Sequence, residues 1–83
     1  MTPIATFATL DDAESALDWI GVDFVERDAT FEGVLDGDDR ALLEAAIDDP
    51  DTPGPIRDLA TALRGAWTAS GTPTMPFAVG WGA

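Results

Sequence analysis

The 83-residue sequence contains no cysteine, histidine, lysine or tyrosine, and these absences limit the chemistry open to it. Without cysteine, the chain has neither a disulfide nor a thiolate zinc site. General acid–base catalysis near neutral pH usually draws on those four side chains. Two carboxylates alone can hydrolyse a glycoside, but so short a chain rarely forms the deep pocket that this reaction needs. We therefore expect a protein that is not an enzyme and binds no cofactor.

Positive charge is scarce, and the acidic residues are unevenly distributed. The chain has 16 acids against four arginines, a net charge of −12. Residues 11–51 hold 15 of the acids and two arginines, a net charge of −13, whereas residues 52–83 hold one acid and two arginines. Such a surface repels nucleic acids and anionic membranes. We expect a protein partner, either basic or a neighbouring subunit of an assembly, with no direct nucleic acid and no membrane.

The sequence also has no segment typical of membrane insertion or export. Its longest uncharged run, residues 65–83, contains four glycines and two prolines, which argues against a spanning helix. The first residues, Met1-Thr2-Pro3-Ile4, lack the basic and apolar regions of a signal peptide. These features favour the cytoplasm or the interior of a virion over secretion.

The apolar pattern predicts a small α+β single domain in the order β-α-β-β-α-α, followed by an extended segment. Residues 3–10 suit an edge strand or arm. Thr9 suits the cap of a helix over residues 10–20, and Gly21 suits its end. The β-formers that follow predict a hairpin with strands at residues 22–27 and 30–35.

Two more helices are expected in the second half. Residues 36–39 predict a turn and cap before a helix over residues 40–48, which Pro50 ends. Pro55 suits the first position of a third helix with an apolar stripe from Ile56 to Trp67, ending at Gly71. We divide the chain into a compact acidic domain, residues 1–71, and an extended apolar tail, residues 72–83.

One group of acids resembles a metal site. Asp36, Asp38 and Asp39, with Glu44 beyond them, could offer oxygen ligands to calcium or magnesium. Their spacing does not match an EF-hand loop, because the glycine is misplaced and the glutamate comes too early. We interpret these aspartates as turn and cap residues and predict no metal site.

Exposed carboxylates form the first candidate partner-binding surface. On the first helix, Asp11, Glu14 and Asp18 fall opposite the apolar face. Negative charge at the end of the second helix interacts unfavourably with its macrodipole, so we expect a cause outside the helix for the acids found there. The candidate residues are Asp11, Glu14, Asp18, Asp23, Glu26, Asp28, Glu32, Asp48, Asp49 and Asp51. The alternative is a solvated face without a partner.

The uncharged tail is the second candidate. It carries Met75, Phe77, Val79 and Trp81, which form an exposed apolar patch unless they pack somewhere. We expect them to dock on a neighbouring subunit, by strand addition or by filling a groove. The alternative is that the tail folds back and completes the domain's own core.

Two segments resemble head–tail connector proteins of long-tailed bacteriophages. They are Ala8-Thr-Leu-Asp-Asp-Ala-Glu-Ser-Ala-Leu17 and Ala41-Leu-Leu-Glu-Ala-Ala-Ile-Asp-Asp49. That family often begins with a capped Thr-Leu-Asp-Asp helix and continues into a helix rich in alanine and leucine. The hairpin at 22–35 and the apolar tail depart from this pattern. The resemblance implies a viral protein with a role in phage assembly.

The leading hypothesis is therefore a small structural or assembly protein, a non-catalytic protein–protein interaction module that docks through its tail. One alternative is an acidic DNA mimic that inhibits a host nucleic-acid-binding or defence protein, because carboxylates along a helix can approximate backbone phosphates. The other is a halophilic domain whose charge is environmental. The concentration of the acids in one half of the chain argues against this last hypothesis.

Overall fold

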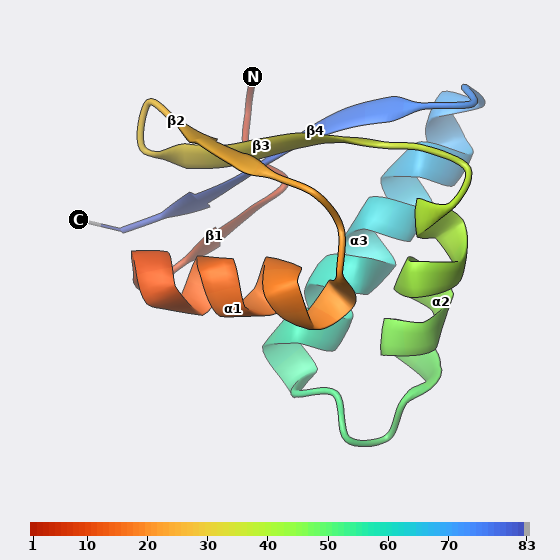
Figure 1. The fold of residues 1–83 in the computed structure, drawn as a ribbon, viewed down its shortest axis with the longest axis horizontal. Helices are drawn as coiled ribbons and strands as arrows, with labels where there is room; N and C mark the ends of the chain where they lie inside the picture. Colours follow the sequence, from red (N-terminus) through yellow and green to blue (C-terminus); the bar gives the residue numbers. More distant parts are fainter. Residues whose placement is uncertain (83) are drawn as a thin grey trace.

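The computed structural model describes residues 1–82, which fold in the order β1-α1-β2-β3-α2-α3-β4. The strands are β1 (Ala5–Phe7), β2 (Val25–Arg27), β3 (Thr30–Leu35) and β4 (Met75–Trp81). The helices are α1 (Leu10–Ile20), α2 (Asp39–Asp48) and α3 (Gly54–Ser70). Figure 1 shows the three helices on one face of the sheet. The predicted α+β class is confirmed, with one more strand than expected.

Helix α1 follows its local signals closely. The Thr9 hydroxyl accepts a hydrogen bond from the Asp12 amide at 3.1 Å, which satisfies one free N–H of the first turn. Gly21 ends the helix with φ +93°, a left-handed conformation that glycine adopts without strain. Both predicted ends of the helix are confirmed.

The β2–β3 hairpin turns at Asp28 and Ala29, where it was predicted, but β2 is shorter than the expected strand at 22–27. Both turn residues have positive φ, 51° and 63°, which is the pattern of a type I′ turn. That turn fits the twist of a hairpin, although neither residue is glycine. Asp28 and Ala29 therefore hold a backbone conformation that glycine adopts more easily.

Helices α2 and α3 pack against each other, and Trp67 joins them to the segment that follows. The Trp67 ring is 2% exposed, its Nε1 donates to the Thr72 carbonyl at 3.0 Å, and the Arg40 guanidinium lies 4.3 Å from the ring centroid. Pro55 stands in the first turn of α3, one residue after the predicted first position, which Gly54 occupies. Among residues 1–82, no helix is long and apolar enough to cross a bilayer.

The C-terminal segment is an interior strand of the sheet, whose order is β1-β4-β3-β2. Strand β4 runs parallel to β1 and antiparallel to β3, so that Val79 pairs with Ala5 on one side and Phe31 on the other. Residues 1–71 therefore lack a central part of the fold. The division into a domain at 1–71 and a separate tail at 72–83 is wrong.

The predicted docking residues of that segment lie in the chain's own core or against it. Phe77 and Val79 are 3% and 0% exposed, and Met75 and Trp81 are partly buried against the same cluster. Their alternation along β4 turns them toward the helices, because alternate residues of a strand face opposite sides of the sheet. The expectation that these four side chains dock on a neighbouring subunit is corrected.

Candidate interaction surfaces

The acidic row on α1 lies where the sequence predicts it. Ala13, Ala16, Leu17 and Ile20 are buried. Asp11, Glu14 and Asp18 are exposed on the remaining surface of the helix. Residues three and four apart on a helix lie about 5–6 Å apart at their Cβ atoms. The helix thus presents three carboxylates in a row toward solvent, while its core contacts come from other residues.

A second group of acids surrounds the β2–β3 hairpin at the edge of the sheet. Asp23, Glu26 and Asp28 are exposed. Glu32 differs from them, because it is half-buried and its Oε2 accepts a weak hydrogen bond from the Thr30 hydroxyl at 3.5 Å. Three of the four predicted carboxylates are therefore free to meet a partner.

The third group, at the end of α2, is partly explained by local structure. The Asp49 carboxylate accepts a hydrogen bond from the Asp51 amide at 2.9 Å, which forms the turn after the helix. The Asp49 carbonyl accepts another from Arg57 Nη2 at 2.8 Å. The Asp49 carboxylate therefore has a structural role in the turn that follows the helix. Asp48 and Asp51 have exposed side chains.

The aspartates before α2 build a turn, as predicted. The Asp36 amide donates to the Asp39 carboxylate at 2.9 Å, and the Asp38 amide donates to the Asp36 carboxylate at 3.0 Å. Two of these carboxylates thus satisfy backbone donors in the turn before the helix. The predicted cap is wrong, because the Asp38 side chain at the N-cap position accepts no hydrogen bond from the helix. Across residues 1–82, no group of three or more acids has the geometry to hold a metal ion.

The three acidic groups do not form one compact patch. In Figure 1, the β2–β3 turn, which contains Asp28, lies far from the α2–α3 turn, which contains Asp51, and α1 lies between them. The acidic character therefore extends over several sides of the fold. The α1 row is the most regular part of it.

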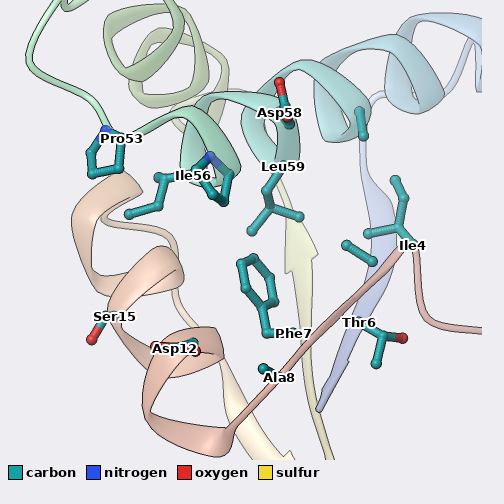
Figure 2. A pocket seen from close by; sticks show the side chains of 13 residues that line it. Ile4, Thr6, Phe7, Ala8, Asp12, Ser15, Pro53, Ile56, Asp58 and Leu59 are labelled. Carbon is teal, nitrogen blue, oxygen red and sulfur yellow. The ribbon is translucent and has the colours of Figure 1, made fainter. Parts of the chain in front are cut away.

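A groove that the sequence did not predict runs between β1, α1 and α3. Its volume is about 750 Å³. Figure 2 shows Phe7, Ile56 and Leu59 along its floor, with Asp12 and Ser15 on α1 and Asp58 on α3 beside it. It combines segments at residues 4–8, 12–15 and 53–62, so no single stretch of sequence signals it. The uncharged sequence of β1, Ala5-Thr6-Phe7, is the one local hint.

Comparisons with known proteins do not assign the chain to a family. No family model matches the chain, and no curated protein or solved structure matches it either. The acidic row, the groove and the composition of the chain are therefore the features that indicate its function.

Proposed function

We propose that this protein is a non-catalytic interaction module that binds a basic protein partner through its exposed carboxylates. The observation that carries the proposal is the α1 row of Asp11, Glu14 and Asp18. These residues are exposed, and the fold uses the opposite face of the helix for its core. A row of carboxylates attracts a cationic surface over a distance of about one Debye length, roughly 8 Å at physiological salt.

The composition supports a binding role over catalysis. The chain has no histidine, lysine, cysteine or tyrosine to activate a nucleophile or move a proton near neutral pH. A small assembly protein inside a cell or a phage particle fits this composition and the resemblance of the two helical segments. In this proposal the acidic faces do the docking, because β4 is occupied within the sheet.

The test immobilises three forms of the protein and incubates each with an extract of the source organism. The first is the full chain, and the second carries Asp11→Asn, Glu14→Gln and Asp18→Asn. The third is a control that removes two exposed acids outside the candidate surface, Asp38→Asn and Glu44→Gln. We expect the full chain and the control to retain basic proteins that rising salt releases, and the α1 variant to lose them. Equal retention by the α1 variant would contradict the proposal.

The same experiment separates the DNA-mimic alternative. A mimic occupies the nucleic-acid site of its target, so duplex DNA should displace every retained protein. Displacement by DNA favours inhibition of a nucleic-acid-binding enzyme. Retention in the presence of DNA favours an assembly partner.

A further inference from the structure

The two edges of the sheet differ in chemistry. The β2 edge carries Glu26 and Arg27 and ends in a strained turn, features that discourage another strand from pairing with it. The β1 edge has the uncharged sequence Ala5-Thr6-Phe7. Within residues 1–82, β1 pairs with β4 alone, so its outer edge has no strand partner. The β1 edge is therefore the one open to strand addition.

The groove follows the length of β1, between the strand and helices α1 and α3. Consecutive residues of a strand point to opposite faces, yet all five residues from 4 to 8 line the groove. The cavity therefore extends along the whole strand, and the edge of β1 that β4 leaves unpaired borders it. An extended chain laid in it would therefore lie alongside β1, as a further strand of the sheet does.

The walls offer room and apolar surface to such a chain. The volume of about 750 Å³ lies within the range of about 300–1,000 Å³ that is typical of ligand pockets. Phe7 is half-buried and lies beside Leu59 and Ile56 at the floor (Figure 2). Exposed Ala62 and Ser15 stand on the two helical walls. Alternate side chains of a bound strand would enter this apolar space.

The charges beside the groove indicate which kind of partner segment it binds. Its lining contains two ionisable side chains, Asp12 from α1 and Asp58 from α3, and both are acidic and exposed. Arg57 is directed elsewhere, to the Asp49 carbonyl. A second copy of this chain, with a net charge of −12, is repelled from such a site. A segment with arginine or lysine beside its apolar residues is attracted to it.

We propose that this groove binds an extended segment of a partner protein by strand addition to β1, with apolar side chains of the segment on the groove floor and its cationic side chains beside Asp12 and Asp58. The inference rests on the proposed function, since both require a basic partner. It adds the place where the partner binds, the groove beside β1, and the extended conformation of the partner's segment. A small apolar ligand would fill the floor, but it would leave the β1 edge without hydrogen-bond partners.

The test measures fluorescence anisotropy of labelled synthetic peptides with the full chain. The main probe alternates arginine with valine, and two controls alternate arginine with serine and glutamate with valine. We expect the arginine–valine peptide to bind most tightly and to shift the NMR amide signals of residues 4–8. Ala62→Phe fills the groove from an exposed helix position and should weaken binding at least tenfold. The matched control Ala69→Phe lies on the same helix outside the groove and should not.

Further variants keep the test decisive if Ala62→Phe disturbs the fold. Ser15→Phe fills the groove from the opposite wall and should weaken binding in the same way. Asp12→Asn and Asp58→Asn should each weaken it about two- to fivefold, as expected for exposed ion pairs. Circular dichroism of every variant reports whether it is folded.

Three outcomes would overturn the inference. Equal binding of the arginine–serine peptide, unaffected by Ala62→Phe, would show that charge alone is recognised, and would leave the proposed function intact. Equal binding of the glutamate–valine peptide would mark the groove as a site for apolar ligands in general. If the arginine–valine peptide does not bind, the groove is not the proposed binding site. The extract experiment would still decide separately whether the α1 row retains basic proteins.

Discussion

The rings of Phe31 and Trp81 lie in contact, with centroids 4.6 Å apart and planes inclined by 44°. Phe24 extends this cluster by an edge-on contact with Phe31 at 4.9 Å. The three rings tie the last strand of the chain to the hairpin. Aromatic residues near the C-terminus therefore stabilise the sheet from within.

Replacing Trp81 by alanine should destabilise the fold. Trp81 is half-buried, so we expect a loss of about 2–3 kcal/mol in the free energy of unfolding, somewhat less than for a fully buried tryptophan. Chemical denaturation followed by circular dichroism measures this loss. The control is Trp19→Phe. Trp19 is exposed, but the replacement removes its part-buried hydrogen bond to the buried Thr52 hydroxyl and should cost about 1 kcal/mol. A Trp81 variant as stable as the natural chain would argue against the cluster.

Replacing Ala29 by glycine should stabilise the protein by about 1 kcal/mol. Ala29 occupies the left-handed region with φ +63°, where a side chain is strained and glycine is not. The same exchange at Ala41, an exposed position within α2, should destabilise the protein by about 1 kcal/mol. Thermal unfolding of the two variants should therefore shift in opposite directions. A downward shift for Ala29→Gly would contradict the type I′ turn.

Gly33 should tolerate no side chain. A Cβ at this position would collide with the Asp23 carbonyl oxygen and would lie 2.8 Å from the Phe77 ring. We expect Gly33→Ala to lower the free energy of unfolding by about 2–3 kcal/mol, as overpacking does elsewhere. Gly65 is the control, because it lies within α3 with no atom within 4 Å of an added Cβ. Gly65→Ala should raise stability by up to about 1 kcal/mol, and a loss of similar size at both sites would refute the close contact.

Salt should stabilise the fold moderately. A net charge of −12 produces self-repulsion that ions screen, with a Debye length of about 8 Å at 0.15 M and 3 Å at 1 M. We therefore expect the midpoint of thermal unfolding to rise with sodium chloride, with most of the rise below about 0.3 M. The full chain should be folded in dilute buffer. Folding that begins only in molar salt would support the halophilic alternative instead.

The sequence predicts α1 well because its signals are local. Thr9, the alternation of buried and exposed positions and Gly21 all act within a few residues of the helix. The same applies to the turn at Asp36, which its own side chain builds. Local chemistry of this kind can be read without knowing the rest of the fold.

The role of the C-terminal segment could not be predicted from local signals of this kind. Its two prolines indicate an extended chain but do not say which strands it pairs with. Pro76 is tolerated because it lies beyond the part of β4 that pairs with β1, so that β3 is its only neighbouring strand within residues 1–82. The position of β4 in the sheet also depends on β1, where Ala5 pairs with Val79, 74 residues further along the chain. The groove eluded prediction for the same reason, since three distant segments form it.

Strand β4 belongs to the chain's own sheet, and this leaves the acidic faces and the groove as the surfaces that meet a partner. The most direct test is the solution mass and circular dichroism of the full chain and of a truncation to residues 1–71, at low and high salt. We predict a folded monomer for the full chain and an unfolded truncation, since the truncation removes the strand between β1 and β3. A folded, monomeric truncation beside an assembled full chain would contradict the account and restore the C-terminal segment as an anchor between subunits.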